Sequence, residues 1–165
     1  MGVSSLPSKN FPTQANLLVV FKSRFPDITF KPGTHFAWSP KNSTITYVKD
    51  SSNEESNAYA LIHEVAHAEL GHLSFSDDFG LLALEVAAWN HAKSLATSVN
   101  IAIDEEYVQD CLDTYRDWLH ARATCPTCGI VSLQVNEAAY SCFNCRTSWK
   151  VPKSQACRVS RRVIA

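Results

Sequence analysis

The stretch LIHEVAHAEL occupies residues 61–70 and places His63 and His67 on either side of Glu64 in a largely apolar sequence. Residues four apart lie within about 40° of each other on a helix, so the two imidazoles share one face. Two imidazole nitrogens on one face can bind a single zinc ion, and a carboxylate beside the first ligand can take a proton from zinc-bound water. The pattern predicts a catalytic zinc site with Glu64 as the general base. The alternative is a core helix with two hydrogen-bonded histidines.

Two residues further along the chain compete to be the third zinc ligand. Glu85 is the only carboxylate in the apolar run 79–89, where a buried unpaired charge would be costly and a zinc ion would compensate it. His72 is the other candidate, because HEVAHAELGH superficially matches H-E-x-x-H-x-x-G-x-x-H. Its glycine, however, stands one residue late and its last histidine one residue early. We therefore expect Glu85 to complete the ligand set, with His72 beside the site or on the surface.

Four of the six cysteines form two C-x-x-C pairs, Cys125 with Cys128 and Cys142 with Cys145. Four thiolates on two tight turns suit a closed tetrahedral zinc site. The N-terminal sequence MGVSSLPSKNFPTQ lacks the long apolar core of an export signal, so we expect a reducing cytoplasm and a metal site in place of disulfides. The spacing predicts a zinc ribbon. We therefore expect two zinc ions per chain, one catalytic and one structural.

Composition indicates a globular protein without a global electrostatic preference. Hydrophobic residues make up 45% and charged residues 19% of the chain, which is typical of a folded domain. The formal net charge is −1, so no overall field favours nucleic acid or a membrane surface. No apolar run approaches the ~20 residues that span a bilayer. We expect no membrane partner.

The spacing of apolar residues predicts four helices and three short strands, and the stretch IVSLQVNEAAYSC (130–142) between the cysteine pairs predicts two more short strands. The helices cover residues 13–25, 51–72, 77–100 and 104–123. The first three strands cover residues 28–33, 34–40 and 43–50. The alternation in TITYV (44–48) favours a strand at an edge of the sheet, where it would pair with an extended substrate backbone.

Two histidines, a glutamate from the following helix and an open fourth position make the gluzincin arrangement, and the chain resembles the ImmA/IrrE-type metallopeptidases. The residues that carry the resemblance are TITYV, ALIHEVAHAELGH and LLALEVAAWNHAKSLA, so it covers about residues 13–100. The resemblance implies His63, His67 and Glu85 as zinc ligands and Glu64 as general base. It also implies a zinc-dependent endopeptidase that cleaves a protein substrate, such as a repressor.

The predicted fold class is α+β: a minimal zincin-like metallopeptidase domain, with a small antiparallel or mixed sheet plus helices, followed by a zinc ribbon. Composition changes near Thr124, after which leucine and isoleucine become scarce. We predict four parts along the chain. They are a flexible tail (1–12), the zincin-like domain (13–123), the zinc ribbon (124–151) and a basic tail (152–165).

Two other functions compete with this interpretation. The chain is also similar to SprT-like proteases, which act on DNA-associated proteins, but their third ligand is a histidine and LSFSDDFGLLALE (73–85) contains none. A non-catalytic zinc-binding regulatory module is the other alternative, although binding alone would not need Glu64. The ribbon itself has Arg146, Lys150, Phe143 and Trp149 for a basic-aromatic surface that would contact nucleic acid or protein. A purely structural appendage is equally compatible with these residues.

Overall fold

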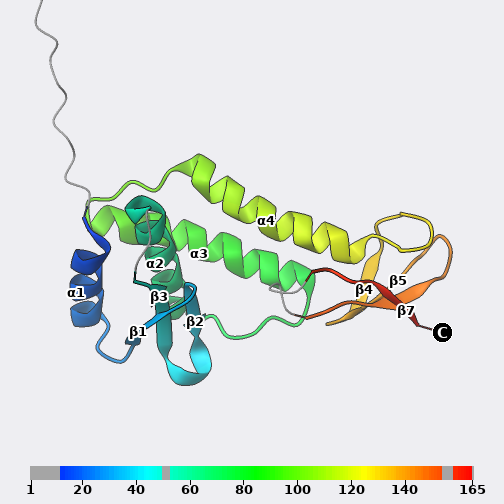
Figure 1. Ribbon diagram of the computed structural model, residues 1–165, viewed down its shortest axis with the longest axis horizontal. Coiled ribbons are helices and arrows are strands. Elements are labelled where there is room, and N and C mark those ends of the chain that lie inside the picture. The colour runs from blue at the N-terminus through cyan, green and yellow to red at the C-terminus, as the bar shows by residue number, and fades with distance from the viewer. Residues whose placement is uncertain (1–11, 50–52, 154–157, 165) are drawn as a thin grey trace, which may run out of the picture. The chain divides into compact units, whose positions relative to one another are not determined.

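The computed structural model describes residues 12–49, 53–153 and 158–164, and within them the chain is an α+β protein with four α-helices and two small sheets (Figure 1). The helices are α1 (Gln14–Arg24), α2 (Glu54–Glu69), α3 (Asp78–Ser98) and α4 (Glu105–Ala123). The strands are β1 (Thr29–Gly33), β2 (Ala37–Ser39), β3 (Thr44–Val48), β4 (Leu133–Asn136), β5 (Ala139–Ser141), β6 (Ser148–Lys150) and β7 (Arg162–Ile164). The α+β class expected from the sequence is confirmed. The predicted tail 1–12 lies, except for Pro12, outside the described residues.

The ends of α2 follow from local chemistry. Asn53 caps its N-terminus, because the side-chain oxygen accepts a hydrogen bond from the Ser56 amide. At the other end Gly71 adopts a left-handed φ of 65°, and the His72 amide donates to the His67 carbonyl. The helix therefore ends before His72, three residues earlier than the sequence predicted.

The first sheet is three-stranded with the order β1-β3-β2, so the expectation that residues 44–48 form an edge strand is wrong. β1 pairs with β3 in parallel and β2 pairs with it antiparallel, which leaves β3 in the centre and β2 at an edge. The polar positions of TITYV misled the prediction. The Thr44 hydroxyl donates to the Asn42 carbonyl and the Thr46 hydroxyl to the Ala37 carbonyl, so neither position requires solvent.

The described chain forms two compact units. The first comprises the described residues up to 72 together with 88–103, and the second comprises 73–87 together with the described residues from 104 onward. The boundary falls within α3, which contributes to both units. α4 groups with β4–β7 in the second unit, whereas the sequence composition placed it in the preceding domain. The sequence also predicts that the segments before and after Thr124 fold independently, and this stays a prediction.

The second sheet is antiparallel with the order β4-β5-β6-β7. Its buried cluster contains Tyr140 and Trp149, whose rings stack with centroids 5.5 Å apart, together with Cys125, Cys142 and Val151. β7 comes from residues 152–165, which the sequence predicts as a tail. A three-residue strand with two arginines nearby has too weak an apolar pattern to be found in advance.

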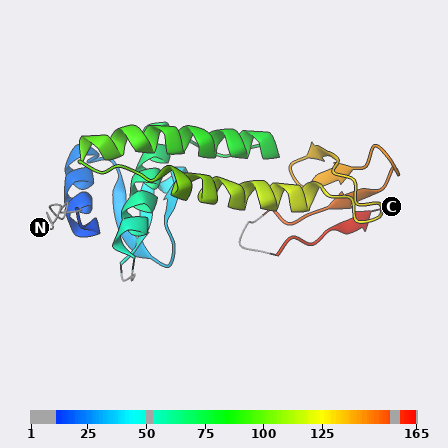
Figure 2. The same ribbon diagram turned by 90° about the horizontal axis from the view of Figure 1, so that it is seen from above.

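Arg122 fixes α4 to this sheet inside the second unit. Its side chain is 1% exposed and lies over the Trp118 ring at 4.1 Å. The guanidinium donates to the Tyr140 hydroxyl and to the carbonyls of Glu137 and Pro152. The Arg122 carbonyl in turn accepts from the Trp149 indole. Figure 2 shows α4 leading through a short loop into the sheet that these contacts hold.

No helix among the described residues is both long and apolar enough to cross a membrane.

Arg122→Met should lower the free energy of unfolding by about 3–5 kcal/mol, because it removes a buried charge and leaves its partners unsatisfied. Arg116→Met, on the same helix, removes a surface ion pair with Asp113 and should cost less than about 1 kcal/mol. Urea denaturation followed by circular dichroism measures both variants. Equal losses for the two variants would contradict the structural role assigned to Arg122.

Candidate metal centres

The histidines of α2 converge on one point. His63 and His67 lie one turn apart, and their Nε2 atoms are 3.0 Å from each other. A carboxylate oxygen of Glu85, on α3, joins them in a group whose candidate ligand atoms all lie within 4.8 Å of one another. Tetrahedral zinc ligands at 2.0–2.1 Å are separated by about 3.4 Å, so the group has the size of a metal site. The three predicted ligands can therefore bind a metal ion together.

Trp89 explains why Glu85 reaches the histidines. Its ring stacks on the His63 imidazole with centroids 4.1 Å apart. Glu85 lies four residues earlier on the same helix and therefore projects from the same face of α3. Both Glu85 and His63 are 6% exposed and His67 is half-buried, so two of the three candidate ligands lie in a largely dehydrated environment. Apolar burial of this kind strengthens the interaction between a cation and its ligands.

His72 lies beside the metal-binding group and is not a member of it. Its Nδ1 is 2.9 Å from Nδ1 of His67, the ring nitrogen that does not contact His63. Histidines that bind metals commonly use the second ring nitrogen to contact another polar group, which fixes the ring. The position of His72 thus suits a residue that orients His67.

Glu64 is also outside the metal-binding group, and the edge strand β2 holds it. The Trp38 amide donates to Oε2 of Glu64 at 2.6 Å. The Trp38 indole donates to the His72 carbonyl, so one residue contacts both the carboxylate and the loop after α2. Trp38 could not be identified from the sequence, because its backbone N–H contacts Glu64 and every residue except proline has such a donor.

The four cysteines predicted as ligands also form a metal-binding group, and all are free thiols. The Sγ atoms of Cys125 and Cys145 are 3.6 Å apart, and those of Cys128 and Cys142 are 3.5 Å apart. Zinc–sulfur bonds of about 2.3 Å in a tetrahedron separate neighbouring sulfurs by about 3.8 Å. The arrangement therefore fits a closed site with four thiolates.

The environment of Cys142 and Cys145, the second of the two C-x-x-C pairs, favours the thiolate form of these two cysteines. The backbone N–H of Cys145, followed by the Ser132 hydroxyl, lowers the pKa of the Cys142 thiol to about 6. The Thr147 hydroxyl and amide lower the pKa of Cys145. Metal binding requires deprotonated cysteine, so hydrogen bonds of this kind favour binding near neutral pH.

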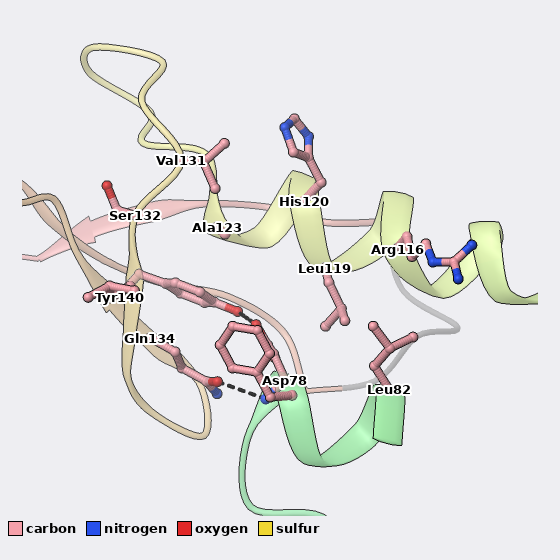
Figure 3. Close-up of a pocket in the computed structure, with 12 residues that line it drawn as sticks. Asp78, Leu82, Arg116, Leu119, His120, Ala123, Val131, Ser132, Gln134 and Tyr140 are labelled. Carbon is pink, nitrogen blue, oxygen red and sulfur yellow. Dashed lines mark hydrogen bonds between the residues drawn. The ribbon is translucent and has the colours of Figure 1, made fainter. Parts of the chain in front are cut away.

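The second unit also contains an apolar hollow of about 340 Å³ (Figure 3). Leu82, Leu119, Val131 and Leu133 line it, and Asp78 and Tyr140 stand at one side. Burial, and then the Asp78 carboxylate, raise the pKa of Tyr140, so its hydroxyl stays protonated and donates to Asp78. The other carboxylate oxygen of Asp78 lies 3.5 Å from Nε of Arg122. None of the residues of the two metal-binding groups lines the hollow.

No protein-family model, curated protein or solved structure matches this chain. The two metal centres are supported by the geometry of the residues themselves.

Glu85→Ala should release the metal held with the two histidines and leave the metal of the cysteine group in place, because the first group loses an anionic ligand. His72→Ala should keep both metals. Elemental analysis after passage over a chelating resin measures each variant. If Glu85→Ala kept both metals and His72→Ala lost one, His72 and not Glu85 would be the third ligand.

Proposed function

We propose that this protein is a zinc-dependent endopeptidase of the gluzincin type that cleaves a protein substrate. The observation that carries the proposal is the position of Glu64. It lies next to a metal ligand in sequence, remains outside the metal-binding group and is oriented by the Trp38 amide. A carboxylate placed in this way serves as a general base, whereas a metal site that only stabilises the fold has no use for it.

His63, His67 and Glu85 would hold the zinc ion, which supplies a Lewis acid for the scissile carbonyl and lowers the pKa of the attacking water. Glu64 would accept a proton from the attacking water and would later pass it to the leaving amine. The Trp38 N–H keeps the carboxylate in one orientation between the two transfers. His72 restrains the imidazole of His67 through the second ring nitrogen.

The substrate backbone would lie along β2. β2 is the sheet-edge strand whose Trp38 amide contacts Glu64, and an extended peptide beside it would approach the base directly. The sequence predicted that residues 44–48 would pair with the substrate. These residues form β3, which lies between β1 and β2 and has no free edge, so β2 takes this role in the proposal. Pairing through the backbone suits an endopeptidase, because it holds an extended substrate by main-chain hydrogen bonds that do not depend on the substrate's side chains.

His63, His67 and Glu85, with Glu64 beside them, are consistent with a zincin-like site of the ImmA/IrrE type, and the cysteine group is consistent with a structural zinc ribbon. Regulatory proteins such as repressors are then the candidate substrates, and the free thiols suit a reducing cytoplasm. A SprT-like protease would use a histidine as third ligand, and the presence of Glu85 in the metal-binding group disfavours it. The placement of Glu64 disfavours a non-catalytic module.

Glu64→Gln should lower the turnover by at least about 100-fold and retain the metal, because an amide has a similar shape and cannot accept the proton. Glu69→Gln is the matched control, since Glu69 is on the same helix but pairs with His91 and Arg24 at the surface. Mass spectrometry of a peptide library incubated with metal-loaded protein measures cleavage. Wild-type cleavage by Glu64→Gln would exclude Glu64 as the base.

A further inference from the structure

The positive charge of this chain is concentrated at its C-terminal end. Residues 124–165 contain six lysines and arginines and a single acidic residue, Glu137. The preceding part of the chain contains nine lysines and arginines against fifteen acidic residues. Glu137 is itself engaged by Lys153, at 2.5 Å. The overall charge of −1 therefore conceals a basic segment that includes the four-stranded sheet.

The strand register places two of these cations side by side. Lys150 on β6 is directly opposite Arg162 on β7 in an antiparallel pair, so the two side chains project from the same face. Both are exposed. Like charges in directly opposite positions destabilise a sheet, so the pair costs folding stability unless an anion neutralises it.

The face that carries this pair is the outer one. Trp149, between Ser148 and Lys150, points to the other side, where it is fully buried against Tyr140. Ser148 shares the face of Lys150, and its hydroxyl is 3.4 Å from that of Ser141. The outer face thus combines two cations with two hydroxyl groups, all of which can donate hydrogen bonds to phosphate oxygens.

An aromatic ring and a further cation stand at one end of the same sheet. Phe143 directly follows Cys142 in the turn after β5, and its side chain is 67% exposed. Arg146 follows Cys145 in the same turn, with a left-handed φ of 66°. An exposed ring near cations is typical of surfaces on which unpaired bases stack.

We propose that this outer face, defined by Ser141, Ser148, Lys150 and Arg162 with Phe143 and Arg146 at its end, binds the phosphodiester backbone of a single-stranded nucleic acid. The cations and hydroxyl groups contact phosphates, and Phe143 stacks on a base. This activity is additional to peptide hydrolysis and does not depend on it. An acidic polypeptide would use the same cations, but it would have no use for the exposed ring.

Fluorescence anisotropy with a labelled single-stranded 20-mer tests the proposal on the full, metal-loaded chain. Lys150→Gln with Arg162→Gln should weaken binding by at least about tenfold at low salt and make the slope of log affinity against log salt shallower by about 1.4. Lys153→Gln with Arg161→Gln is the matched control. It removes the same charge from residues engaged with Glu137 and the Thr124 carbonyl, and binding should change by less than about threefold.

Two further variants separate the contacts from folding. Lys150→Arg with Arg162→Lys keeps both charges and should keep the affinity, and the circular dichroism spectrum of the glutamine variant should match that of the wild-type chain. Phe143→Ala should weaken single-strand binding by about fivefold or more, with a smaller effect on duplex DNA, whose bases are already stacked.

Three results would overturn the proposal: no binding of the 20-mer by the wild-type chain at low salt, equal losses in the two glutamine variants, or competition by polyglutamate as effective as that by unlabelled 20-mer. The last result would assign the face to an acidic protein.

Discussion

The burial of Glu85 beside His63 and His67 is the constraint on which the proposed chemistry depends. A carboxylate is expensive to remove from water, and two imidazoles alone neutralise it only when protonated. A divalent cation among the three groups compensates the charge and uses the nitrogen atoms as ligands. The stacking of Trp89 on His63 determines which face of α3 meets α2. Glu85 projects from this same face and is therefore directed toward the histidines.

Trp38 connects the sheet to this chemistry. Through its amide it orients Glu64, and through its indole it holds the loop after α2 that carries His72. One position in β2 therefore fixes the proposed base, the residue behind His67 and the edge where a substrate would lie. A shift of that strand would misplace both contacts together, so the proposed catalytic arrangement is only as rigid as the edge strand.

Local patterns predicted the helices, the strands of the first sheet and the residues of both metal-binding groups, because each depends on spacings of a few residues. Glu85 was identifiable as an isolated acid in an apolar run. The order of the strands was not, since Thr44 and Thr46 look solvent-facing until their bonds to backbone carbonyls are known. The attachment of α4 to the second sheet was likewise hidden. Arg122 resembles an ordinary cation in the last turn of a helix, and only its tertiary partners show that it is buried.

The two metal-binding groups differ in what the metal does for the fold. α2 packs through Leu61, Ile62 and Val65, whose side chains are fully buried in an apolar core. In the second sheet, by contrast, two of the five residues of the buried cluster are cysteines of the metal-binding group. A small cluster of this kind buries too little apolar surface to hold strands of three or four residues in place. A metal bound at the cysteine group would therefore contribute folding free energy directly, whereas at the histidine group the surrounding core would leave a bound metal available for the proposed chemistry.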